Sequence, residues 1–147
     1  MKREKIGFRV RIISNLLRRY IDHMIAVKHD GKFTRMQGWI VAFIAEQHDK
    51  KDIFQKDIEE EFIIRRSTAT AILQRMEKSG LITRNSVDYD GRLKKIQLTP
   101  AAMEEHVKIE KDIEEFEENL ANQIDKDDLA AFFRVLDQIE EKLSDHF

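Results

Sequence analysis

The sequence predicts a mainly α-helical fold with one small β-hairpin, and three observations lead to this expectation. Long stretches repeat apolar residues every three or four positions, which is the period of a helix packed on a core. The 147 residues include one proline and five glycines, so few breaks interrupt these stretches. Two short β-competent runs, residues 81–87 and 92–98, surround the turn-forming dipeptide Asp90-Gly91.

The composition indicates one soluble domain, residues 1–147, that needs no cross-link. A chain of this length can bury a sizeable core on its own. It contains no cysteine, which excludes disulfides, thiol nucleophiles and cysteine redox sensing, and which is typical of a reducing compartment. The charged N-terminal stretch has no apolar run long enough for a signal peptide or a membrane span. We therefore expect a cytoplasmic protein.

The first helix is expected from about Lys5 to about His29, with Gly31 as its stop. Its apolar face is unusually wide and consists of Ile13, Leu16, Leu17, Tyr20, Ile21, Met24 and Ile25. A capping box of Thr34 and Gln37 then predicts the start of a second helix that runs through Ile44. The polar residues 47–52 end this second helix.

A short extended piece at residues 53–54 leads into a brief helix over residues 55–62, whose inward side chains would be Ile58 and Phe62. After a turn at residues 63–65, another helix extends to about Lys78, and Ser67 has the side chain expected of its N-cap. Gly80 would end this helix. Its inward stripe is Ala69, Ile72, Leu73 and Met76.

The hairpin is expected to turn tightly at Asp90-Gly91, where the backbone would need a positive φ angle. Thr99-Pro100 then predicts the start of a long acidic helix to about Gln123. Asp125 and Asp128 open the last helix, whose apolar stripe is Leu129, Phe132, Phe133, Leu136, Ile139 and Leu143. The apolar faces of the first and last helices are too wide for one small domain to cover, so they indicate association between subunits.

Charge is distributed unevenly along the chain, although the formal net charge is only -2. Residues 63–97 carry eight basic and three acidic side chains, whereas residues 101–147 carry five basic and fifteen acidic ones. A local cationic face favours a polyanion as partner, because affinity for phosphates depends on where charge is presented. The alternative, that these cations only solvate helix faces, stays open at this point.

The order helix, turn, helix, hairpin is that of a winged helix-turn-helix, here residues 34–99. In such a fold the second helix of the motif enters the major groove of DNA, and the hairpin (the wing) contacts the backbone or the minor groove. Arg65 and Arg66 would meet phosphates at the helix entry, and Ala71 could touch a thymine methyl group. The candidate DNA-binding residues are Arg65, Arg66, Ser67, Thr68, Thr70, Gln74 and Arg75 on the helix, and Arg84, Asp90, Arg92, Lys94 and Lys95 on the wing.

Residues 80–99 resemble the wing signature of MarR-type (multiple antibiotic resistance) regulators. Gly80-Leu81-Ile82-Thr83-Arg84, Asp90-Gly91-Arg92 and Leu98-Thr99 match that signature in order and spacing, and residues 33–44 are similar to the family's second helix. The resemblance implies a homodimeric bacterial transcription regulator, in which residues 1–30 and 100–147 form dimerisation helices above two wings. It also implies that Arg92 contacts DNA and that Asp90 orients it or a neighbouring arginine. Ala102 departs from the pattern, since a glycine is common near this position.

The resemblance further implies a repressor on a pseudo-palindromic operator, and several relatives release DNA when they bind aromatic or phenolic acids. Tyr20, Trp39 and Phe43 are the candidate residues for such an effector crevice, although aromatic residues at helical spacing are more often core residues. No cofactor is expected. The identity of an effector, if there is one, is left open.

Neither catalytic motifs nor a complete metal-binding motif occur in the sequence. The sequence lacks a phosphate-binding glycine loop, a zinc-protease motif and a nucleophile elbow, so we do not expect an enzyme. Residues 86–97 partly match the pattern of a calcium-binding loop. They lack its first carboxylate, since Ser86 is in that position, and its final glutamate, since Gln97 is in that position. His106 and Glu110 could share a helix face as metal ligands, yet no tight histidine pair accompanies them. A metal-sensing regulator and a winged-helix module that binds only proteins remain the alternatives.

Overall fold

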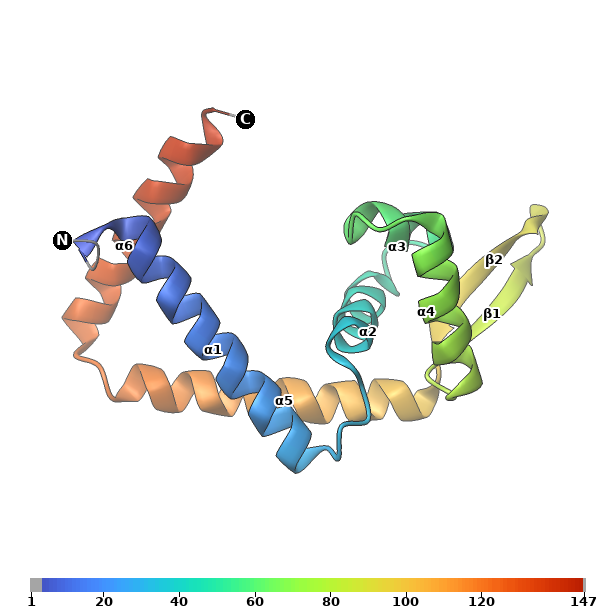
Figure 1. Cartoon of the computed structure of the whole chain (residues 1–147), viewed down its shortest axis with the longest axis horizontal. Helices are drawn as coiled ribbons and strands as arrows, with labels where there is room; N and C mark the ends of the chain where they lie inside the picture. Colours follow the sequence, from blue (N-terminus) through green and yellow to red (C-terminus); the bar gives the residue numbers. More distant parts are fainter. Residues whose placement is uncertain (1–3, 147) are drawn as a thin grey trace. The chain divides into compact units, whose positions relative to one another are not determined.

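The computed structural model describes residues 4–146, and in this range it is mainly helical with one antiparallel hairpin (Figure 1). The predicted fold class is therefore confirmed. The elements follow the chain as α1 (Ile6–Lys28), α2 (Arg35–Gln47), α3 (Gln55–Glu61), α4 (Arg66–Lys78), β1 (Ile82–Val87), β2 (Asp90–Leu98), α5 (Pro100–Asn122) and α6 (Lys126–Ser144). Among the helices described, none combines the length and apolar character needed to cross a membrane.

The chain forms two compact units, and the boundary between them falls inside α5. The first unit ends at Ile109 and contains α1 to α4, the hairpin and the first turns of α5. The second begins at Glu110 and contains the rest of α5 together with α6.

The core of the first unit fills the space between α2, α3, α4 and the hairpin. Its fully buried side chains are Ile40, Val41, Ile44, Ile53, Ile58, Leu73, Met76, Ile82 and Ile96. Each such side chain contributes about 1.5–3 kcal/mol by leaving water. Because Ala69, Leu73 and Met76 of α4 are all buried, the predicted inward stripe is confirmed and the rotation of α4 about its axis is fixed.

The predicted helix starts at Thr34, Thr99 and Asp125 are confirmed. The Thr34 hydroxyl accepts a bond from the Gln37 amide at 3.2 Å, and the Gln37 side chain accepts one from the Thr34 amide at 3.0 Å. The Thr99 hydroxyl accepts from the Ala102 amide at 3.2 Å, and the Asp125 carboxylate accepts from two amides of the first turn of α6.

The expected N-cap of α4 at Ser67 is wrong. The helix begins at Arg66, and its N-cap is Arg65, which has an extended backbone and makes no side-chain capping bond. The reason lies in the preceding turn, where Ile63 has a φ of +51° and the chain leaves in an extended conformation. The Arg65 carbonyl consequently accepts the first helical bond, from the Ala69 amide at 3.0 Å.

The predicted stop at Gly80 is confirmed. Gly80 has a φ of +76°, a conformation that glycine adopts at little cost. The Leu81 amide bonds to the Met76 carbonyl and the Gly80 amide bonds to the Glu77 carbonyl. This pair of bonds is a Schellman motif, and it directs the chain from α4 straight into β1.

The expected tight turn at Asp90-Gly91 is also wrong. Val87 pairs with Asp90, so the two residues at the tip are Asp88 and Tyr89, while Asp90 and Gly91 belong to β2. Gly91 is not among the residues with positive φ in the described chain. Instead the Asp90 carboxylate accepts a bond from the Arg92 amide at 3.0 Å, beside an irregularity in the register between Ser86 and Val87. A side chain, rather than glycine, therefore shapes the wing tip.

The loop before α3 pairs with the wing, which the sequence did not predict. The Ile96 amide donates to the Ile53 carbonyl at 2.7 Å and forms an isolated antiparallel bridge. This bond attaches β2 to the segment between α2 and α3.

Candidate nucleic-acid interface

The helix α4 packs against α3 and against β1, and the wing projects beside it (Figure 1). Since the buried stripe of α4 faces the core, the opposite side of the helix faces solvent. The predicted DNA-facing residues that are exposed there are Arg65, Arg66, Ser67, Thr68, Gln74 and Arg75, together with Ala71 and Lys78.

Residues of α3, α4 and the wing line one open concavity of about 470 Å³, which we call the wing groove. From the predicted set it brings together Arg66 and Thr70 of α4 with Arg84, Arg92 and Lys94 of the wing. Its remaining lining residues are Phe54, Gln55, Lys56, Glu59, Leu93 and Ile96, which the sequence analysis did not single out. The helix α4 and the wing thus share a single, largely cationic surface.

Gln55, the first residue of α3, ties the start of α4 to α3. Its side-chain amide donates to the Thr70 hydroxyl at 2.8 Å and to the Arg66 carbonyl at 3.3 Å. The Thr70 hydroxyl in turn donates to the Arg66 carbonyl at 2.9 Å. The hydroxyl hydrogen of Thr70 is therefore used in a bond to the helix backbone. The contact with Gln55 could not be predicted from the sequence, because the two residues lie in different helices.

The three wing cations of the wing groove are held by neighbouring polar groups. Arg84 Nε lies 2.8 Å from Glu77 Oε2, Arg92 Nε lies 3.2 Å from Asp90 Oδ1, and Lys94 Nζ donates to Ser86 Oγ at 2.7 Å. The hydrogen bond from Arg84 lowers the pKa of Glu77, and hydrogen bonds from the Arg92 side chain and backbone lower the pKa of Asp90. The Arg92 guanidinium is largely solvated, so a phosphate could replace its carboxylate partner at low cost.

Lys95 is not brought into the wing groove. It neighbours Lys94 in β2, and neighbouring side chains of a strand point to opposite faces. Its ammonium lies 2.7 Å from Asp52 Oδ1, and this hydrogen bond lowers the pKa of Asp52. The Tyr89 hydroxyl also donates to Asp52, at 3.4 Å. Asp52 thus holds the wing at its tip and along β2.

The predicted effector residues lie on different parts of the first unit. Phe43 packs edge-on against Phe62 with ring centroids 5.9 Å apart, and it lines a concavity with Asp57 and other residues of α3. Tyr20 on α1 and Trp39 on α2 are about half exposed and do not line that concavity. A crevice formed by all three stays a prediction.

One buried charged cluster was missed by the sequence analysis. His29 Nδ1 lies 2.6 Å from Glu105 Oε1, and Lys32 Nζ donates to Glu105 Oε2 at 3.1 Å. Burial alone would raise the pKa of Glu105, but the hydrogen bonds from Lys32 and His29 leave it below the ordinary value. Within residues 4–146, no group of three or more His, Asp or Glu side chains is arranged to hold a metal ion.

Comparison with known proteins gives a family match over the winged segment. The model of the MarR family matches residues 32–93. A search of curated proteins finds no match. Among solved structures, MepR of Staphylococcus aureus, a transcription regulator of the multidrug efflux pump MepA, has a TM-score of 0.82 at 20% identity over 95% of this chain and 98% of that chain. A MepR–DNA complex has a TM-score of 0.71 at 21% identity, covering 90% and 96%.

Two further structures are more similar in sequence. The transcription regulator MarR from Oenococcus oeni is 28% identical, with a TM-score of 0.62 over 93% of this chain and 99% of that chain. The heme sensor protein PefR from Streptococcus agalactiae is 27% identical, with a TM-score of 0.63 over 95% and 94%. Residues 32–93 thus match the MarR family, and the chain shares its fold with these regulators.

Proposed function

We propose that this protein is a sequence-specific regulator of transcription that binds double-stranded DNA. The observation that carries the proposal is the wing groove, where Arg66 of α4 meets Arg84, Arg92 and Lys94 of the wing. A DNA duplex presents a major groove flanked by phosphates. This arrangement is complementary to a surface on which the helix and the wing of a winged helix-turn-helix both carry cations. The MepR–DNA complex supports the same kind of partner.

In this proposal α4 enters the major groove with its exposed side. Gln74 is the side chain best suited to read a base, since its amide can bond an adenine with both donor and acceptor. Arg65 and Arg66 lie at the N-terminal end of α4, where unpaired amides add favourable partial charge for a phosphate. Arg92 and Lys94 would follow the backbone or the minor groove beside it.

The wing cations would exchange their present carboxylate partners for phosphates. Asp90 holds Arg92 through both its backbone and its side chain, and thereby orients a guanidinium whose side chain is 92% exposed. Binding of this kind releases counterions from DNA, so its affinity falls steeply with salt.

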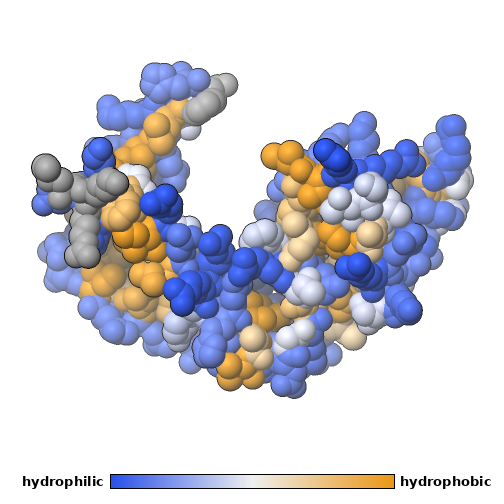
Figure 2. Space-filling model, viewed as in Figure 1, coloured by the Kyte–Doolittle hydropathy of each residue, from blue (hydrophilic) through white to orange (hydrophobic). Residues whose placement is uncertain are grey.

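We further propose that the active form is a homodimer. No residue of α6 is buried within the chain, and Phe132, Phe133 and Val135 are each about half exposed. Figure 2 shows hydrophobic surface along this helix. Considered separately, α1 buries only Met24 and exposes Ile13, Leu16 and Tyr20. Apolar surface of this extent is typical of association sites, and a second copy of the chain would cover it. Two copies would present two α4 helices to the half-sites of a pseudo-palindromic operator.

We also propose that the protein represses transcription and that a small molecule causes it to release the operator. PefR is a heme sensor, and this relative supports control by a ligand without defining the class of ligand here.

The experiment that tests the proposal is selection of duplexes from a randomised pool, followed by titration of a retained duplex at several salt concentrations. A dimer with about 6–10 phosphate contacts should lose about 10³–10⁵ in affinity between about 50 and 200 mM salt. Failure to retain any duplex, or an affinity that salt does not change, would favour a module that binds only proteins.

A further inference from the structure

Gln55 belongs to α3, yet its side chain bonds to the first turn of α4 and lines the wing groove. Most charged side chains that line this groove are hydrogen-bond donors: Lys56, Arg66, Arg84, Arg92 and Lys94. Such cations suit phosphates or guanine. Among the described lining residues, only Gln55, Glu59 and Thr70 have a side-chain oxygen that can accept a hydrogen bond.

The orientation of the Gln55 amide follows from the chemistry of its two partners. The Arg66 carbonyl can only accept, and it already accepts the hydroxyl hydrogen of Thr70 at 2.9 Å. Because this hydrogen is used, Thr70 Oγ1 can only accept from Gln55. The Gln55 atom that lies 2.8 Å from Thr70 Oγ1 and 3.3 Å from the Arg66 carbonyl must therefore be Nε2, which has two hydrogens to donate.

The Oε1 atom of Gln55 is consequently the part of the side chain that remains for a ligand. Within residues 4–146, no group donates a hydrogen bond to it. Every buried side-chain oxygen of the described residues has a partner, so an oxygen without a partner must be accessible to solvent. The two bonds of Nε2 hold this acceptor in one direction before any ligand binds, which lowers the entropic cost of a contact.

The position of Gln55 places its free acceptor close to base edges in the proposed complex. In a helix-turn-helix, the N-terminal residues of the helix in the major groove contact the bases. Gln55 is bonded to Arg66 and Thr70, which lie in the first turns of α4. Phosphates offer acceptors only, and so do the major-groove edges of guanine and thymine. The amino groups of adenine and cytosine are the donors in that groove.

We propose that Gln55 reads one base of the operator by accepting a hydrogen bond at Oε1 from the amino group of an adenine or a cytosine. The inference rests on the proposed DNA binding and adds a specificity residue that lies outside α4. Glu59 is less suited to this role, because the phosphates of the duplex repel its carboxylate. Thr70 Oγ1 is already occupied by Gln55.

The test uses the full-length protein and a duplex selected from a randomised pool. Each adenine and each cytosine is replaced in turn by its analogue without the amino group, and gel shift measures the affinity. At one position of a half-site, the replacement should weaken binding of the wild type by about fivefold, because one hydrogen bond is lost. The same replacement should weaken Gln55→Ala much less. The kind of base at that position shows whether adenine or cytosine is read.

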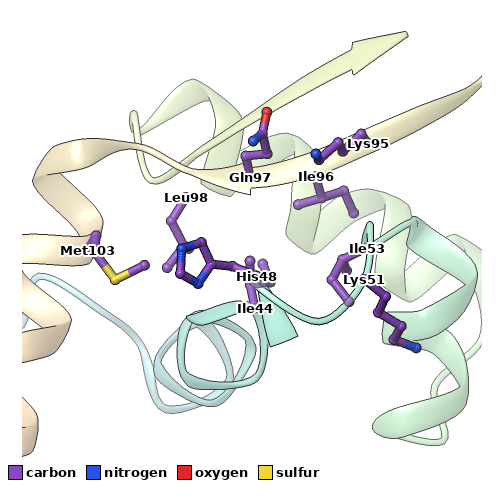
Figure 3. Close-up of a pocket in the computed structure, with 9 residues that line it drawn as sticks. All are labelled: Ile44, His48, Lys51, Ile53, Lys95, Ile96, Gln97, Leu98 and Met103. Atoms are coloured by element: carbon purple, nitrogen blue, oxygen red, sulfur yellow. The ribbon is translucent and has the colours of Figure 1, made fainter. Parts of the chain in front are cut away.

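Gln97→Ala is the matched control. Gln97 is an exposed glutamine of the wing that does not line the wing groove. Figure 3 shows it on the opposite side of β2 from Ile96 and Leu98. This variant should respond to every replacement as the wild type does. If Gln55 only held α4 in place, Gln55→Ala would weaken binding to all duplexes equally, and no position would lose its effect.

A second measurement needs no DNA. Nuclear magnetic resonance relaxation should show a rigid side-chain amide group for Gln55 and a mobile one for Gln97, and Thr70→Val should make the Gln55 group more mobile. A Gln55 amide as mobile as that of Gln97 would overturn the proposal. Retention of a duplex with no position coupled to Gln55 would overturn it as well, while leaving the proposed DNA binding intact. Failure to retain any duplex would overturn both.

Discussion

His29 Nδ1 lies 2.6 Å from Glu105 Oε1, although the two residues are 76 positions apart and both are buried. The contact ties the end of α1 to the first turns of α5, and Lys32 adds a third group. Because a buried carboxylate stabilises the fold only when it is paired, this cluster should be sensitive to the loss of any member.

Glu105→Ala should lower the free energy of unfolding by about 3 kcal/mol, since it leaves His29 buried without its carboxylate. Chemical denaturation with a circular dichroism signal measures this change. Glu104→Ala, at an exposed neighbouring position, is the matched control and should change stability by less than about 0.5 kcal/mol. Equal effects of the two variants would show that the cluster does not stabilise the fold.

The pKa of Glu105 lies below its ordinary value of 4.5, and this predicts a dependence of stability on pH. The unfolded chain takes up the proton at a higher pH than the folded chain does. The contribution of Glu105 is therefore complete above about pH 4.5 and is lost as the pH falls through the lower pKa of the folded state. Unfolding measured at a series of pH values should show a shallower loss of stability in Glu105→Gln than in the wild type. Parallel curves would contradict the assignment.

Arg92→Ala should weaken operator binding by about tenfold and reduce the salt dependence by about one phosphate contact, because it removes a guanidinium that Asp90 orients. Gel shift at several salt concentrations measures both changes, and sedimentation should show an unaltered dimer. Lys108→Ala removes an exposed cation from α5 that is paired in a similar way with Glu104. If both variants lose affinity equally, only the total charge matters and Arg92 has no specific role.

Gln74→Ala should change sequence preference more than overall affinity, because Gln74 lies on the exposed side of α4 and can read a base edge. Selection of duplexes from a randomised pool by the wild type and the variant measures this. Gln138→Ala, an exposed glutamine on α6, should select the same sequences as the wild type. An unchanged preference in Gln74→Ala would remove the proposed role.

Ile63 is 92% exposed and has a φ of +51°, which is unfavourable for a β-branched residue. Ile63→Gly should therefore raise the free energy of unfolding by about 1 kcal/mol, because glycine adopts this conformation without strain. Ile64→Gly is the matched control and should destabilise the protein, because Ile64 is partly buried against the core. A loss of stability in Ile63→Gly would show that the side chain makes a stabilising contact of its own.

Local signals in the sequence predicted the helices and most of their ends correctly. The capping box of Thr34 and Gln37, the Thr99-Pro100 start and the stop at Gly80 depend on neighbours within a few residues, and such patterns are visible in sequence. Ser67 was assigned by side-chain preference alone, whereas the turn at Ile63 determines where α4 begins.

Contacts between distant parts of the chain could not be predicted. The register of the wing depends on a bond from the Arg92 amide to the Asp90 side chain, so the turn lies two residues earlier than the Asp90-Gly91 signal suggested. Lys95 was grouped with the wing cations by its position in sequence, but its partner Asp52 lies on the loop before α3. No periodicity in sequence reveals a pair such as His29 and Glu105.

The most direct test of the central claim is a nuclear magnetic resonance titration of the labelled full-length protein with a selected duplex. The account predicts that the side-chain signals of Arg66, Arg84, Arg92 and Lys94 shift together as the duplex binds, because they line one wing groove. Lys95 should shift much less, since it lies outside that groove and is paired with Asp52. Shifts confined to α1 or α6, with the four wing-groove signals unchanged, would contradict the account.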